Sequence, residues 1–282
     1  MDSIEHLRSW IGRSEQRTDT ITAAPLAGLA ATLDRDDPAP AQGSAVPPLW
    51  HWLYFLPMAR QSELGPDGHP RRGGFLPPVA LPRRMWAGGR LVFERPLRVG
   101  QVATRRSRIA DVTAKSARSG PLVFVTVVHD VSTTEGIALR EEHDIVYREA
   151  PAPGAAPAPP PAAPRDETFL RTIVADDVLL FRYSALTFNG HRIHYDRRYV
   201  TEVEGYPGLI VHGPLIATLL LDLLRRQHPG ATVARFEFKA ISPLFDRAPF
   251  EVCGRADGAS RFALWARNRD GGLAMQASAD VA

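Results

Sequence analysis

Residues 213–226 read Gly-Pro-Leu-Ile-Ala-Thr-Leu-Leu-Leu-Asp-Leu-Leu-Arg-Arg, which is the strongest helical pattern in the chain. Proline is favoured in the first turn of a helix, where its missing N–H is not needed. The pattern therefore predicts a helix over 214–226. This helix is apolar on most sides, and a helix of that kind must be buried. A sheet wrapped around the helix is the arrangement that covers it.

Four strand-like runs follow the helix, at 233–241, 250–256, 261–267 and 273–281. Between the last two runs, residues 270–272 read Asp-Gly-Gly, which is typical of a hairpin turn. Short strands joined by tight turns predict an antiparallel sheet. A helix combined with such a sheet places this part of the chain in the α+β class.

The first part of the chain has a related layout. An apolar helical pattern covers 23–33, and a long Pro/Gly-rich stretch follows from 38 to 89. Three strand-like runs come next, at 99–113, 122–132 and 137–147. One apolar helix followed by antiparallel strands is therefore predicted for each half of the chain.

Residues 150–164 are nearly all Ala and Pro, a composition that builds no core and favours extended linkers. We interpret them as a linker between two domains, 1–149 and 165–282. A faint sequence echo between 95–100 and 242–247, each leading into a strand, suggests that the domains are repeats. Two such units would pair within one chain as a pseudo-dimer, and a homodimer of whole chains is the alternative.

The composition is that of a globular protein, with 44% hydrophobic and 23% charged residues in a chain of 282. The net charge of +3 is mild, and no nucleic-acid-binding motif is found, so no nucleic-acid partner is expected. The longest apolar stretch, 208–224, contains His212, Pro214 and Asp222, so no membrane span is expected. Residues 1–6 lack the pattern of a secretory leader, which predicts a cytoplasmic location.

Polar side chains concentrate in residues 186–196, which read Leu-Thr-Phe-Asn-Gly-His-Arg-Ile-His-Tyr-Asp. Such a dense set of donors and acceptors in one short stretch is typical of a site. The lone His212, beside the apolar helix, is interpreted as a packed core residue. Gly213 lies at the helix start, where the helix dipole favours negative charge, so its N–H could stabilise an oxygen that gains charge.

Together, residues 186–196 and 208–215 resemble the MaoC-like (R)-specific enoyl-CoA hydratases. The nearest subgroup contains mesaconyl-C4-CoA (3-methylfumaryl-CoA) hydratase and 3-hydroxyacyl-thioester dehydratase. Residues 50–55 and 73–78 resemble the N-terminal dehydratase domain of these proteins, so the likeness covers most of the chain. It implies a double hot-dog fold, with two antiparallel sheets each wrapped around a central helix.

The resemblance also implies an activity and a set of roles. Water is added reversibly across the double bond of a 2-enoyl-CoA thioester, as in the conversion of mesaconyl-C4-CoA to citramalyl-CoA. No cofactor or metal is expected, because the thioester itself acidifies the neighbouring carbon. Residues 1–149 would then form mainly the substrate channel. The site residues that it implies are His194, Asn189 and Gly213 as catalytic groups, and His191, Arg192, Tyr195 and Thr218 as substrate-binding groups.

Asn189 occupies the position at which the wider family has aspartate, although the nearest subgroup also carries asparagine there. This places more weight on His194 as the acid–base group. Thr218 would help to orient Asn189. Three alternatives stay open: an acyl-CoA thioesterase, a non-catalytic acyl-thioester-binding protein, and a metal site formed by His191, His194 and His212.

Overall fold

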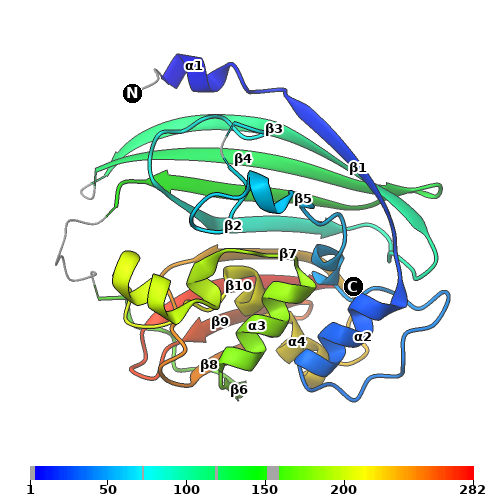
Figure 1. The fold of residues 1–282 in the computed structure, drawn as a ribbon. Helices are drawn as coiled ribbons and strands as arrows, with labels where there is room; N and C mark the ends of the chain where they lie inside the picture. The colour runs from blue at the N-terminus through cyan, green and yellow to red at the C-terminus, as the bar shows by residue number, and fades with distance from the viewer. Residues whose placement is uncertain (1–3, 72, 118–119, 151–158) are drawn as a thin grey trace.

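The strands of the protein form one antiparallel sheet, as seen in a computed structural model that describes residues 4–71, 73–117, 120–150 and 159–282 (Figure 1). The strand order is β1-β3-β4-β5-β2-β7-β10-β9-β8-β6. The strands are β1 (Ser14–Thr20), β2 (Arg83–Phe93), β3 (Val102–Ala117), β4 (Gly120–Thr133), β5 (Gly136–Arg148), β6 (Phe169–Ile173), β7 (Val233–Ala240), β8 (Phe250–Ala256), β9 (Arg261–Arg267) and β10 (Leu273–Val281).

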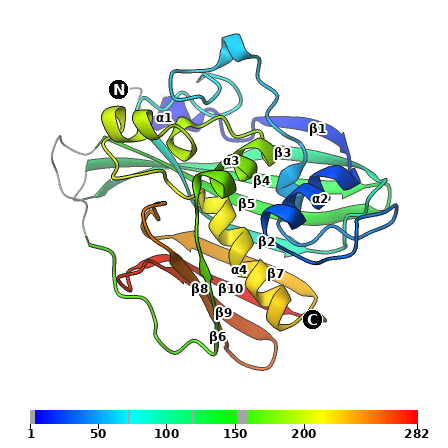
Figure 2. The same ribbon diagram turned by 60° about the horizontal axis from the view of Figure 1, so that its bottom comes forward.

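The longer helices lie on one face of this sheet, with α4 at its centre in the second half (Figure 2). The helices are α1 (Ile4–Arg8), α2 (Ala23–Thr32), α3 (Asp177–Leu186), α4 (Gly213–Gln227), the short η1 (Trp50–Leu53), η2 (Gln61–Glu63) and η3 (Arg192–His194), and the π-helical turn η4 (Tyr199–Val203). None of the described helices is long and apolar enough to cross a membrane.

The expected α+β class, the buried helix in the second half and all seven expected strands are confirmed. Every residue of α4 from Leu215 to Leu224 is buried, and the helix packs against β8, β9 and β10. The expected bounds of β8, β9 and β10 agree with the structure.

The two halves have the same topology, which supports the suspected repeat. The order β1-β3-β4-β5-β2 in the first half corresponds to β6-β8-β9-β10-β7 in the second. The two sheets do not stay separate, because β2 pairs antiparallel with β7 and joins them into one. Without this pairing, β2 and β7 would each be an edge strand with unpaired backbone N–H and C=O groups, and the pairing supplies partners for these groups.

The first half has only a short counterpart of α4. The Val211 N–H donates to the Leu244 carbonyl (2.9 Å) just before α4, and the Val46 N–H donates to the Leu97 carbonyl (2.8 Å) just before η1. By this correspondence η1 takes the place of α4. The expected central helix of the first half, α2, corresponds to α3 instead and packs against it. The interior face of the first-half sheet is thus not covered by a long helix of its own.

Two glycines bring β2 and β7 together. A Cβ atom at Gly88 would lie 2.6 Å from the Phe238 carbonyl oxygen, and one at Gly89 would lie 2.9 Å from the Phe238 ring. Real side chains do not tolerate such distances, so this part of β2 requires glycine. We call the pairing of β2 with β7 the seam.

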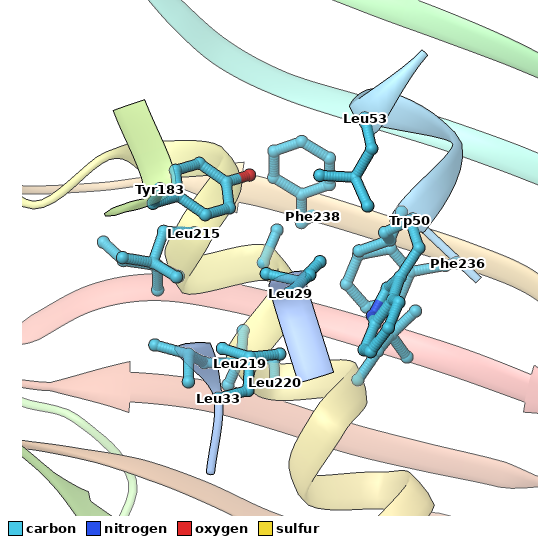
Figure 3. Close-up of a cluster of buried hydrophobic side chains, with 14 of the residues drawn as sticks. Leu29, Leu33, Trp50, Leu53, Tyr183, Leu215, Leu219, Leu220, Phe236 and Phe238 are labelled. Carbon is cyan, nitrogen blue, oxygen red and sulfur yellow. The ribbon is translucent and has the colours of Figure 1, made fainter. Parts of the chain in front are cut away.

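The main hydrophobic core extends across both halves. Leu29 of α2 and Leu33, directly after it, lie beside Leu219 and Leu220 of α4, with Trp50 of η1 nearby (Figure 3). A helix from the first half therefore helps to bury the central helix of the second half.

Most of the expected linker, 150–164, falls on residues 151–158, which lie outside the described residues. The end of the linker packs against the second half. The Leu273 N–H donates to the Pro161 carbonyl, and the Ala163 N–H donates to the Gly271 carbonyl.

Candidate active site

A cavity of about 1050 Å³ lies between the two halves. One side of it is formed by the end of α3 and the start of α4. The opposite side is formed by the interior face of β3, β4 and β5, together with residues from 52 to 70. A cavity of this size, partly polar and lined from both halves, suits a small-molecule substrate.

The end of α3 places Asn189 in the wall of this cavity. Phe188 adopts a left-handed conformation (φ 50°), and the Asn189 N–H donates to the Ser184 carbonyl (2.8 Å), which terminates the helix. The Asn189 Oδ1 accepts the His191 N–H at 3.0 Å. The Asn189 side-chain nitrogen has no recorded partner among the described residues, so it is available to a ligand. The left-handed conformation of Phe188 strains its backbone, because Phe188 is not a glycine, and such strain is common at functional sites.

The ring of His194 is fixed in one tautomer. Its Nδ1 lies 2.7 Å from the Ile210 carbonyl oxygen, which can only accept, so Nδ1 carries the proton. Nε2 is then an acceptor in the neutral ring. Burial lowers the pKa of His194 to about 4, although the bond to Ile210 works in the opposite direction. The ring is therefore a neutral base at pH 7.

His212 lies against His194 and supports it. The two rings are stacked with their centroids 3.7 Å apart. The His212 Nε2 lies 2.8 Å from the Ser184 hydroxyl oxygen, and burial lowers the pKa of His212 well below its usual value. His212 is fully buried, as expected for a core residue, but its position beside His194 gives it a further part in the site.

The start of α4 has open space beside its first residue. Gly213 is the first residue of the helix, and no acceptor for its N–H is recorded among the described residues. No atom lies within 4 Å of a Cβ placed there, and Gly213 is not among the glycines with positive φ. Pro214 lines the cavity. The Thr218 hydroxyl donates to the Pro214 carbonyl (2.8 Å) within α4, and no hydrogen bond between Thr218 and Asn189 is found among the described residues.

The remaining predicted residues hold the motif against the loop at 65–70. Arg192 donates to Asp196 and to the Pro66 carbonyl, and the Tyr195 hydroxyl donates to the Gly190 carbonyl. Arg192 and Tyr195 both line the cavity as well.

His191 lies against His69 from the first half, with the ring centroids 4.0 Å apart. Together with Asp67, these two histidines have ligand atoms within 4.8 Å of one another. They form the one metal-compatible group found among the described residues. The alternative group of His191, His194 and His212 is not among the metal-compatible groups that the described residues form.

Three of the seven predicted residues line the cavity: Asn189, Arg192 and Tyr195. His194 is not among the lining residues. It is connected to the wall through His212, which bonds to the cavity-lining Ser184. Ser184 and His69 were not predicted from the sequence, because only the fold brings them to the motif.

The opposite wall contains polar residues that the sequence did not indicate. Glu141 accepts hydrogen bonds from the Trp52 Nε1–H (3.1 Å) and pairs with His51 Nε2 (3.1 Å). Burial alone would raise the pKa of Glu141, but the bond to His51 and the nearby histidines lower it to about 2. The Nδ1 of His129 lies 2.8 Å from the Ser107 hydroxyl oxygen, and burial lowers the pKa of His129 to about 4. A carboxylate and the neutral ring of His129 therefore face the motif across the cavity.

The fold is a double hot-dog fold of the MaoC-like type. A MaoC-like dehydratase matches the structure with a TM-score of 0.75 and 14% identity, covering 99% of both chains. A conserved hypothetical protein from Mycobacterium tuberculosis, described as a double hotdog fold, matches with a TM-score of 0.58 and 16% identity, covering 96% of both chains. These likenesses establish the fold.

The family model for hydroxyacyl-thioester dehydratase type 2 matches residues 49–246, and the chain belongs to this family. It is 51% identical to the mesaconyl-C(4)-CoA hydratase of Chloroflexus aurantiacus over 273 residues, 97% of each chain. It is 29% identical to the mitochondrial hydroxyacyl-thioester dehydratase type 2 of Schizosaccharomyces pombe, covering 83% of this chain and 88% of the relative. The protein is accordingly an acyl-CoA hydratase/dehydratase, which is a hydro-lyase.

Proposed function

We propose that the acyl group of the substrate is short, branched and dicarboxylic, as in mesaconyl-C4-CoA, and that hydration yields citramalyl-CoA. The observation that carries this proposal is the 51% identity to a mesaconyl-C(4)-CoA hydratase over 97% of both chains. Such a match extends over nearly the whole chain and is not confined to the motif.

We assign the proton transfer to His194. The oxygen of a water molecule bonds to C3 of the enoyl group while Nε2 of His194 accepts a proton from that water. The Ile210 carbonyl holds the other ring proton on Nδ1, which keeps the Nε2 lone pair available. The electron pair of the double bond moves towards C2 and the thioester. The imidazolium then returns its proton to C2, which completes the addition of one water.

We assign the stabilisation of the thioester oxygen to Gly213. Negative charge builds up on this oxygen as water attacks, and the free N–H at the start of α4 is a suitable donor because the helix dipole adds to its effect. The open space around Gly213 supports this role. The side-chain amide of Asn189, in the cavity wall, orients the water beside His194.

The other predicted residues take two kinds of role. Arg192 and Tyr195 line the cavity and contact the substrate. His191 and Thr218 act indirectly, since His191 packs against His69 and Thr218 bonds within α4.

The chemistry is carried by residues 165–282, and residues 1–149 shape the end of the cavity that receives the acyl group. This division is supported by the cavity itself, to which both halves contribute a wall. A cytoplasmic location, and a pseudo-dimeric chain or a homodimer in solution, also stay predictions.

A hydration screen tests the proposed function. Mesaconyl-C4-CoA, crotonyl-CoA and a long-chain 2-enoyl-CoA are each incubated with the protein, and the loss of absorbance at 260 nm is followed. Mesaconyl-C4-CoA should give the highest kcat/KM. Release of free thiol without loss of the double bond would instead identify a thioesterase. Binding without either reaction would identify a non-catalytic acyl-thioester-binding protein.

A further inference from the structure

A row of polar side chains crosses the interior face of the first-half sheet. Ser107, His129 and Glu141 lie opposite one another on β3, β4 and β5. The row separates two hydrophobic clusters, which contain Val131 and Leu139 on one side and Ile109 and Val127 on the other. The face that a long helix would cover in an ordinary hot-dog unit is therefore polar at its centre. Buried polar groups in such a position require partners.

Arg105 extends this row and lacks a partner of its own. It lies on β3, two residues before Ser107, and lines the cavity. No ion pair or hydrogen bond of its guanidinium is recorded among the described residues, and its Nε is buried without a partner. Its recorded contact is with the Phe55 ring, 5.5 Å from the guanidinium carbon. A largely desolvated cation beside a cavity favours an anion as its ligand.

The nearby carboxylate of Glu141 is not the anionic partner of Arg105. Both oxygens of Glu141 accept from the Trp52 Nε1–H, and one of them also pairs with His51. His129 adds a second polar group, because its Nδ1 is bonded to Ser107 and its Nε2 has no recorded partner among the described residues. A fork of N–H groups with an imidazole beside it matches the two oxygens of a carboxylate.

We propose that Arg105, with His129, forms a subsite for a carboxylate at the end of the acyl group that is remote from the thioester. The subsite selects dicarboxylic enoyl thioesters over those with an apolar end. The inference rests on the proposed function, because the catalytic motif on the opposite wall must hold the thioester while the first-half wall holds the carboxylate. It gives the first half, which lacks a long central helix, a role in specificity.

The test uses a matched pair of substrates. Mesaconyl-C4-CoA and 3-methylcrotonyl-CoA differ only in that a methyl group replaces the carboxylate. In the wild type, kcat/KM should be higher for mesaconyl-C4-CoA. Arg105→Met should lower this value on the order of 10- to 100-fold, as expected for the loss of a hydrogen bond to a charged group, and should leave 3-methylcrotonyl-CoA unchanged. Arg105→Lys keeps a cation but not the fork of N–H groups, so its kcat/KM for mesaconyl-C4-CoA should fall less than that of Arg105→Met.

Arg106→Met is the matched control. Arg106 is the next residue on β3, is exposed and points to the other face of the sheet. Its removal should therefore leave kcat/KM unchanged for both substrates. Equal losses with both substrates in Arg105→Met would show that Arg105 contacts the CoA part or only supports the fold, and would overturn the inference. Equal use of both substrates by the wild type would also overturn it. If neither substrate nor any other enoyl-CoA is hydrated, the proposed function itself fails.

Discussion

The ring of His194 lies on the ring of His212, with centroids 3.7 Å apart and planes inclined by 19°. One face of His194 is thus held by a neighbour that is itself anchored to Ser184. Its edge is held by the Ile210 carbonyl. The base is therefore oriented before any substrate binds, and this relationship leads to the first two predictions.

His194→Ala should lower turnover by about two to four orders of magnitude, which is the usual contribution of a general acid–base group. Initial rates of hydration measure it. His228→Ala, at the opposite end of α4, is the control and should keep its rate. Near-normal turnover in a folded His194→Ala protein would contradict the assignment.

His212→Ala should lower kcat more than it changes KM, because it removes the support of the His194 ring without touching the substrate. His212→Phe keeps an aromatic face of similar shape and should retain more activity. Steady-state kinetics of both variants provide the comparison. If the two variants lose the same activity, the bond to Ser184 and not the stacking is what matters.

Gly213→Val should reduce turnover by about 10²- to 10³-fold, as expected when an oxyanion donor is blocked. Gly213 has open space beside it and is not among the residues with positive φ, so the variant should fold normally and keep its thermal midpoint. Leu223→Met, a volume-conserving change in the buried helix, should cost little activity. Full activity in Gly213→Val would exclude Gly213 from the mechanism.

The stability of the protein should fall as the pH decreases from about 6.5 towards 4. Burial lowers the pKa of several histidines, so they are neutral when folded and take up protons only on unfolding. In this window the unfolded chain binds more protons, which makes the free energy of unfolding smaller as the pH decreases, by up to about 1.4 kcal/mol per pH unit for each histidine. The histidines concerned are His69, His129, His143, His191, His194 and His212.

Urea unfolding at pH 7.5 and pH 5.5 measures this effect. His129→Gln removes one of the titrating groups and should flatten the pH dependence. An unfolding midpoint that does not change between the two pH values would show that these histidines are not buried in neutral form.

Gly88→Ala should destabilise the protein by about 1–3 kcal/mol, the usual effect of overpacking. Its methyl group would lie 2.6 Å from the Phe238 carbonyl oxygen, which is backbone and cannot turn aside. Denaturant unfolding provides the measurement. Gly230→Ala has open space and should be close to neutral, so equal effects at both positions would mean that the seam is not tightly packed.

The sequence predicts those parts of the fold that local patterns specify. The apolar run at 214–226 and the Val- and Phe-rich runs identify α4 and seven strands, because burial of one face leaves a periodic trace. β2 was missed because it begins in a Pro/Gly-rich stretch and contains Gly88 and Gly89, which are unfavourable in strands. Those glycines are needed for the close approach of β7, which no local pattern reveals.

The same limit applies to the site. Asn189 and His194 lie within one short motif, so the sequence alone singles them out. Arg105, His129 and Glu141 come from three different strands, and each looks like an ordinary polar residue in its own context. Only the register of β3, β4 and β5 brings them together. Side chains along a strand alternate between the interior and the outer face of the sheet. Polar residues at interior-facing positions of these strands are the one signal in the sequence that could have drawn attention to Arg105, His129 and Glu141.

The seam between β2 and β7 has a consequence for how such a protein can evolve. Two identical subunits would obey a strict twofold symmetry, so that any change in one wall of the cavity would be copied to an equivalent wall elsewhere. Because a single chain carries both halves here, the symmetry is only approximate and each half can diverge independently. One half carries the long helix and the Asn189–His194 motif, and the other has only the single turn of η1 at the corresponding place. After duplication and fusion, an ancestral pair of equal sites can become one larger, asymmetric site.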